Sequence, residues 1–220
     1  MAIRMIRGRR GLLAMSALAV AAVTVVPVSA AMTSAAETVA DVPSDPITVE
    51  VVSINGSGCP AGSATVKPLA DNTGFTVAYS SYAAQANGAA APTEFRENCQ
   101  LGLKLHFPQG FTFAVAQAEY SGTAQLAPGT TGLERANYYF QGSSDDNYSD
   151  HKFYGPLYGR WKVSDTAAAL VYAPCANDRI LNVNTELRVD DGSTTSASSL
   201  RMTASSGDVN SIYHFSWKRC

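Results

Sequence analysis

Histidine, serine and carboxylate side chains could support acid–base or nucleophilic chemistry in this chain, but their spacing matches none of the strong catalytic motifs. We find no Gly-x-Ser-x-Gly elbow, His-Glu-x-x-His pair or phosphate-binding glycine loop in the sequence. The histidines are His106, His151 and His214, so a hydrolase triad would have to assemble from distant positions. Strand alternation places His106 on the solvent side of its strand and His214 opposite Tyr213 and Trp217. We therefore predict no catalytic residue.

The segment 145–150 gathers three aspartates beside an asparagine, and such hard oxygen ligands are those that calcium prefers. The glycine and the distal glutamate of a calcium-binding loop are missing, and acidic turns are common on protein surfaces. Asp145, Asp146 and Asp150 are therefore only a weak metal candidate. We predict a solvated loop, with no metal and no cofactor.

Aromatic residues are concentrated between Tyr138 and Trp161, where 24 residues hold eight of the 20 aromatic residues of the chain. Neighbouring side chains of a strand point to opposite faces, so one member of each adjacent aromatic pair should face solvent. Exposed tyrosines provide a large contact area at low entropic cost in binding surfaces. The candidate binding face consists of Tyr138, Tyr148, Tyr154 and Tyr158. The alternative is that these rings pack into the core on both sides of their strands.

The elements that must position these side chains are short strands with alternating apolar residues. We expect strands at 47–54, 65–69, 75–79, 101–107, 111–120, 135–140, 157–163, 168–172, 183–189, 200–204 and 211–217. Turn sequences such as 71–74 and 190–192 separate them, and 82–91 is expected to be a loop or one short turn. This pattern predicts an all-β fold, a single antiparallel β-sandwich domain over residues 47–220.

Residues 1–30 are predicted to be a signal peptide that is removed on export. A basic start precedes the uncharged apolar run Gly11–Val28, and small residues follow it. Arg9 and Arg10 also fit a twin-arginine signal, so both the general secretory and the twin-arginine route remain open. Residues 31–46 read as a flexible spacer. We expect a secreted, extracellular protein without a stable membrane anchor.

Removal of the leader changes the charge of the protein. Four of the 16 basic residues lie in it, which leaves 12 basic against 18 acidic residues, a net charge of −6. This balance argues against nucleic acid or an anionic membrane as the partner. The remaining chain of about 190 residues is long enough to bury a core.

Four widely spaced cysteines fit an oxidising compartment, since no Cys-x-x-Cys pair suggests zinc or redox chemistry. Three connectivities are possible. We favour Cys59 with Cys99 and Cys175 with Cys220, because each bridge then joins neighbours in sequence.

The chain carries a short glycine and cysteine block at Gly56–Pro60, and further distinctive blocks follow in order at 98–101, 105–110, 138–142, 153–157, 174–175, 181–188 and 217–220. In this order the blocks resemble a family of small secreted bacterial and fungal proteins, catalogued as a domain of unknown function. Gly56–Pro60 resembles the N-terminal GSGCP motif of that family. The resemblance covers residues 47–220 and implies secretion, a disulfide-bearing β fold and no assigned activity.

These observations favour a secreted, non-catalytic β-sandwich that binds an extracellular glycan, a wall polymer or a protein. One alternative is a small hydrolase that uses His106 or His214 with nearby carboxylates in one pocket. Another is an inhibitor or effector that presents a rigid, disulfide-held loop, for which 61–98 is the candidate. The sequence does not choose among ligands or oligomeric states.

Overall fold

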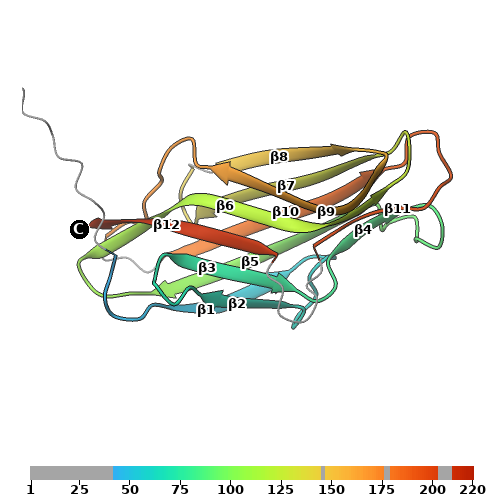
Figure 1. The fold of residues 1–220 in the computed structure, drawn as a ribbon. Coiled ribbons are helices and arrows are strands. Elements are labelled where there is room, and N and C mark those ends of the chain that lie inside the picture. Colours follow the sequence, from blue (N-terminus) through green and yellow to red (C-terminus); the bar gives the residue numbers. More distant parts are fainter. Residues whose placement is uncertain (1–41, 145–146, 176–178, 203–209) are drawn as a thin grey trace, which may run out of the picture. The chain divides into compact units, whose positions relative to one another are not determined.

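The structure is a computed structural model, which describes residues 42–144, 147–175, 179–202 and 210–220. The predicted signal peptide and most of the predicted spacer lie outside these residues. The regular elements of the described part are twelve strands, shown in Figure 1: β1 (Thr48–Asn55), β2 (Ala64–Pro68), β3 (Gly74–Tyr79), β4 (Ala83–Ala86), β5 (Arg96–His106), β6 (Phe111–Leu126), β7 (Thr131–Phe140), β8 (Asn147–Tyr154), β9 (Leu157–Thr166), β10 (Ile180–Asp190), β11 (Ser198–Arg201) and β12 (Ser211–Arg219).

The strands form two antiparallel sheets that pack as a sandwich, which confirms the predicted fold class. The five-stranded sheet has the order β1-β5-β10-β7-β8. The seven-stranded sheet has the order β2-β3-β12-β6-β11-β4, and β9 pairs with the free side of the long strand β6. All strand pairs are antiparallel, as expected for short strands joined by tight turns.

The core lies between the sheets because alternate residues of each strand point inward. In β7, for example, every second residue from Gly132 to Phe140 is buried and the residues between them are partly exposed. Phe113 of β6 lies at the centre of an aromatic cluster, with ring centroids 4.7–5.7 Å from those of Phe107, Phe140, Phe215 and Trp217.

Ten of the eleven predicted strands overlap an observed strand, and three predictions for secondary structure were wrong. Residues 168–172 form no strand. The segment 82–91, expected to be a loop or turn, contains β4. The segment 145–150 was expected to be a solvated loop, but its residues from Asn147 onward belong to β8. This strand escaped detection because its inward positions include Asn147, Ser149 and His151, so apolar alternation is absent.

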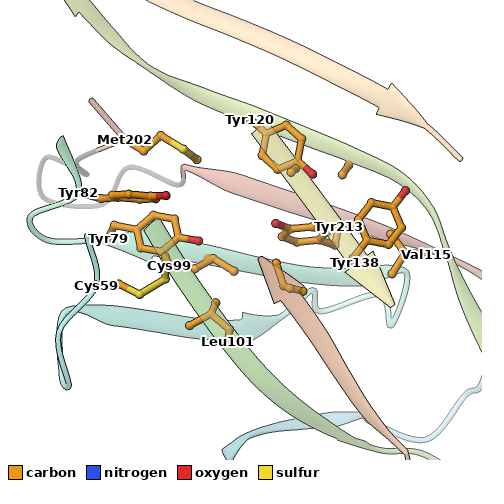
Figure 2. Close-up of a cluster of buried hydrophobic side chains, with 14 of the residues drawn as sticks. Cys59, Tyr79, Tyr82, Cys99, Leu101, Val115, Tyr120, Tyr138, Met202 and Tyr213 are labelled. Carbon is orange, nitrogen blue, oxygen red and sulfur yellow. A yellow bond between two sulfur atoms is a disulfide. The ribbon is translucent and has the colours of Figure 1, made fainter. Parts of the chain in front are cut away.

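The two disulfides have the predicted pairing, Cys59 with Cys99 and Cys175 with Cys220. The first lies beside Tyr79 and Tyr82 in the core, as Figure 2 shows. The second joins the last residue of the chain to the segment that follows β9.

Residues 42–46 have no regular secondary structure, yet Asn72 fixes their path. Its side-chain amide donates hydrogen bonds to the carbonyls of Pro43 (2.8 Å) and Asp45 (3.0 Å). Its Oδ1 accepts one from the backbone of Ile47 (3.1 Å), and its own carbonyl accepts one from Trp217 Nε1 (2.9 Å). The end of the predicted spacer is therefore attached to the sandwich.

Candidate functional site

The four tyrosines of the predicted binding face lie in three different places. Tyr138 is on the inner side of β7 and only 4% exposed, so it is not part of an outer face. Its neighbour Tyr139 takes the outward position. Tyr148 (54% exposed) and Tyr154 (68%) lie on the outer side of β8, and Tyr158 (67%) is on β9 of the other sheet.

Tyr148 borders a polar groove of about 300 Å³ on the outer face of the five-stranded sheet. The strand register places outward side chains of four strands in two rows across the sheet. One row is Gln100, Asn184, Asn137 and Tyr148, and the next is Asn98, Glu186, Arg135 and Asp150. The groove thus offers amide, guanidinium and carboxylate groups beside an exposed aromatic ring.

Ion pairs hold the second row in place. Arg135 donates two hydrogen bonds to Asp150, from Nε to Oδ1 (2.6 Å) and from Nη2 to Oδ2 (2.7 Å). Its guanidinium also lies 4.9 Å from the centre of the Tyr148 ring, within cation–π range. The hydrogen bond from Arg135 lowers the pKa of Asp150, so the carboxylate is ionised at neutral pH.

Glu186 is anchored from the other side of the groove. Arg96 and Arg188 both contact its carboxylate, Arg188 at 2.7 Å. Burial acts to raise the pKa of Glu186, but hydrogen bonds from the two arginines outweigh it and lower the pKa. The row is therefore a fixed pattern of donors and acceptors, with little freedom left to lose on binding.

A second pocket, of about 490 Å³, lies around the start of β8 and the end of β9 and shares Tyr148 with the groove. It is lined by Tyr138, Asn147, Tyr148, Ser149, Asp165, Thr166, Ala167 and Ala168. Tyr148 forms the wall between the outer face and this pocket at the edge of the sandwich, which we call the edge pocket.

The weak metal candidate is not assembled in the described structure. Asp150 faces Arg135, while Asp145 and Asp146 lie outside the described residues. Among the residues that the structure describes, no group of three or more His, Cys, Asp and Glu side chains could hold a metal ion. In the same ranges, no helix is long and apolar enough to cross a membrane.

The two histidines of the hydrolase alternative lie on different sheets. His106 ends β5, where its Nε2 is 3.1 Å from Glu50 on β1 and both side chains are exposed. Its predicted exposure is thus observed. His214 is on β12 of the other sheet and lies near Asp71, whose pKa a hydrogen bond from Thr73 lowers. Neither histidine lines the groove or the edge pocket.

The histidine to which the sequence assigned no role, His151, is the one that meets carboxylates. Its Nε2 lies 2.8 Å from Asp165 of β9 and 4.0 Å from Glu134 of β7. Ser149 donates a hydrogen bond to the other oxygen of Asp165. Serine here bonds to the carboxylate and not to the imidazole, which differs from a Ser-His-Asp triad in which histidine activates serine.

Glu134 is fully buried behind this contact. Burial, and then the negative charges of Asp165 and Asp150, raise the pKa of Glu134 well above its usual range. Neither of its oxygens accepts a hydrogen bond from a described side chain. Glu134 and Arg135 are adjacent charged residues, so no apolar alternation shows which of the two faces the core, and only the fold reveals this buried acid.

The inhibitor alternative expected 61–98 to be a loop held by a disulfide. The Cys59–Cys99 bridge does close this segment, but three strands, β2, β3 and β4, occupy much of it. Near its end, Phe95 is 47% exposed and borders a surface groove of about 680 Å³ with the segment around Asp190.

Comparison with known proteins assigns the chain to a family. The family model described as a domain of unknown function, DUF4360, matches residues 45–220, which include every strand of the sandwich. The chain belongs to this family. The DUF4360 domain begins at Asp45, within the segment that Asn72 attaches to the core.

The description of a curated relative supports the expected extracellular location of this DUF4360 protein. An uncharacterised secreted protein of Arthroderma benhamiae is 29% identical over 180 residues, which cover 80% of this chain and 74% of that protein. Together with two disulfides, which persist in oxidising compartments, this confirms the secreted, extracellular localisation.

Proposed function

We propose that this protein is an extracellular binding module that holds a polysaccharide on the outer face of its five-stranded sheet. The observation that carries the proposal is the polar groove beside Tyr148, with two rows of amide and charged side chains. Sugar hydroxyls need many donors and acceptors at fixed positions, and sugar rings stack on exposed aromatic faces.

The chemistry of the groove favours a neutral or weakly charged glycan over an apolar partner. Asn98, Gln100 and Asn184 provide amide groups that both donate and accept hydrogen bonds. Asp150 compensates the charge of Arg135, while Arg96 and Arg188 share Glu186. These side chains therefore carry one positive charge in excess, which is too little to favour a strongly charged ligand. Tyr148 supplies the ring on which a sugar could stack.

A polymer pull-down with the mature, disulfide-bonded protein tests the proposal. We expect retention on one or more cell-wall or matrix polysaccharides. We also expect Tyr148→Ala to reduce the affinity about 5- to 150-fold, if a sugar gains the about 1–3 kcal/mol that nucleic-acid bases gain by stacking on an aromatic side chain. Tyr154→Ala is the matched control, because Tyr154 is exposed on the same side of β8 but outside the groove.

Two results would contradict the proposal. One is that no polysaccharide retains the purified protein, while another protein from the same culture supernatant binds the purified protein specifically. The other is equal loss of retention in Tyr148→Ala and Tyr154→Ala, which would mean that binding does not depend on the groove.

The GSGCP motif has a structural role in this proposal and not a binding one. The backbone amide of Gly58 donates a hydrogen bond to the carbonyl of Asn98 (2.9 Å), and Asn98 borders the groove. We infer that the motif is a family hallmark because it fixes the start of β5, from which Asn98 and Gln100 project.

A further inference from the structure

We propose that Glu134, His151 and Asp165 form a pH-controlled latch that holds β8 against β9 and so regulates the binding face at Tyr148. This inference rests on the proposed function for its effect on binding, but the latch itself can be measured without a ligand. The argument starts from how β8 is attached to the rest of the domain.

β8 is the edge strand of its sheet and pairs along its length with β7. Its other flank faces β9, which belongs to the opposite sheet. Two side-chain contacts bridge that gap near the start of β8, since both Ser149 and His151 reach Asp165. Nearer the hairpin, Phe153 packs on Trp161, with ring centroids 5.1 Å apart.

Alternation along β8 connects the latch to the binding face. Ser149 and His151 point inward to the latch, whereas Tyr148 and Asp150 point outward to the groove. A shift of β8 away from β9 would therefore move Tyr148 together with Asp150, the partner of Arg135. The latch controls the geometry of the groove through one strand.

The charges of the latch do not balance when all three groups are ionised. Glu134 and Asp165 together carry two negative charges, and one imidazolium neutralises one of them. Glu134 lies directly opposite His151 in the register of β7 and β8, and is fully buried. An ionised carboxylate in such a place is costly. Either one of the two carboxyl groups therefore keeps its proton, or β8 and β9 move apart.

Among the described residues, no lysine or arginine side chain is paired with Glu134 or Asp165. The titratable groups that face the cluster are buried tyrosines of β3, β6, β7 and β12 and of the segment between β3 and β4: Tyr79, Tyr120, Tyr138, Tyr213 and Tyr82. Figure 2 shows Tyr120, Tyr138 and Tyr213 grouped in the core. Burial, and then neighbouring charge, raises the pKa of Tyr138 to about 12, so this phenol stays neutral. On the outer side, Asp150 lies near Glu134, and its negative charge is paired with Arg135.

The direction of the pH effect follows from these contacts. The contact of His151 with Asp165 is an ion pair only while the imidazole is protonated, and its geometry is not that of a well-aligned hydrogen bond. The pKa of Glu134 is raised in the folded state, so its contribution to stability is complete in acid and is lost as the pH rises through that raised value. The latch is closed in acid and released at higher pH.

Amide hydrogen exchange of the full disulfide-bonded protein at about pH 5 and about pH 8, the range in which folded domains are ordinarily most stable, tests the latch. After correction for intrinsic exchange rates, we expect the opening of residues 147–151 to increase at least about tenfold at the higher pH, the change that accompanies a shift of one pKa unit. The edge strand β4, which carries no titratable side chain, provides an internal reference that should not respond.

Three variants sharpen the test. Glu134→Gln keeps the shape of the side chain without its charge, so the increase in β8 opening at the higher pH should become smaller. The part of the response that remains is that of the contact between His151 and Asp165. Asp165→Asn removes the ion pair, so β8 should open at both. His106→Gln changes an exposed histidine that pairs with Glu50 on another strand, and should leave the response as in the wild type.

The outcomes distinguish the latch from the proposed function. If polysaccharide retention falls in parallel with β8 protection, both are supported. If β8 opens with pH but no polysaccharide is retained at either pH, the latch stands and the glycan proposal fails. A wild-type β8 that exchanges equally at both pH values, or a Glu134→Gln variant with an unchanged pH response, would overturn the latch.

Discussion

Gly56 of the GSGCP motif and Gly62, which follows the motif, can each be tested by adding a single methyl group. At Gly56, φ is +133° and an added Cβ would lie 2.2 Å from the carbonyl oxygen of Asn98 and 3.0 Å from Cys99 Cα. At Gly62, φ is +84° and no atom lies within 4 Å of an added Cβ. Both positions therefore strain an alanine, but only the first also clashes with backbone that cannot rotate away.

The two effects have different magnitudes. A non-glycine residue at positive φ costs about 1–2 kcal/mol, which applies to both alanine variants. The clash at Gly56 adds the cost of overpacking, about 1–3 kcal/mol, because carbon atoms in contact normally stay about 3.5–4.0 Å apart. We thus expect Gly56→Ala to lower the free energy of unfolding by about 2–5 kcal/mol and Gly62→Ala by about 1–2 kcal/mol.

Urea unfolding of the disulfide-intact variants, followed by circular dichroism, measures both values under identical conditions. Gly56→Ala should also shift the backbone hydrogen bond between Gly58 and Asn98, visible as faster amide exchange at Gly58. If the two variants lose the same free energy, to within about 0.5 kcal/mol, the steric explanation of the motif is refuted.

Three further predictions concern other parts of the domain. Replacing Cys175 and Cys220 together by serine should lower the free energy of unfolding by about 4 kcal/mol, because the bridge spans 45 residues of chain, and thermal unfolding checks this value. Asn72→Ala should cost about 1–3 kcal/mol and release residues 42–46 to proteolysis, since this buried side chain holds three backbone groups. The pKa of Asp150 is lowered by its hydrogen bond to Arg135, so its contribution is present at neutral pH and is lost as the pH falls through that lowered value. Asp150→Asn should therefore flatten the acid limb of a stability–pH profile, by less than about 1 kcal/mol for this partly exposed pair.

Much of the fold could be read from local patterns. Apolar alternation and turn residues located ten strands, because each strand of a sandwich must bury every second side chain. The spacing of four cysteines and the preference for short loops gave both disulfides correctly. The predicted location outside the cell rested on the same cysteines and on the leader. These features are encoded within a few residues of one another, or in the order of the chain.

Only part of the candidate site could be predicted from the sequence. Tyr148 was among the predicted binding residues, but the same pattern also selected Tyr138, whose side chain is inside, and Tyr158, which is on the other sheet. Alternation states that neighbouring side chains face opposite ways, but it does not state which one faces the core. That choice depends on the register with neighbouring strands.

Tertiary structure alone decided which polar groups meet. The rows of the groove join strands that are far apart in sequence, such as β5 and β10, and no local pattern predicts that Asn184 lies opposite both Gln100 and Asn137. The latch likewise needs β8 to face a strand of the opposite sheet. The sequence by itself determined a secreted, disulfide-bonded β-sandwich, since burial period, turns and cysteine spacing are local. The sheet order decided where its chemistry lies, because pairing between distant strands sets every contact across the sheets.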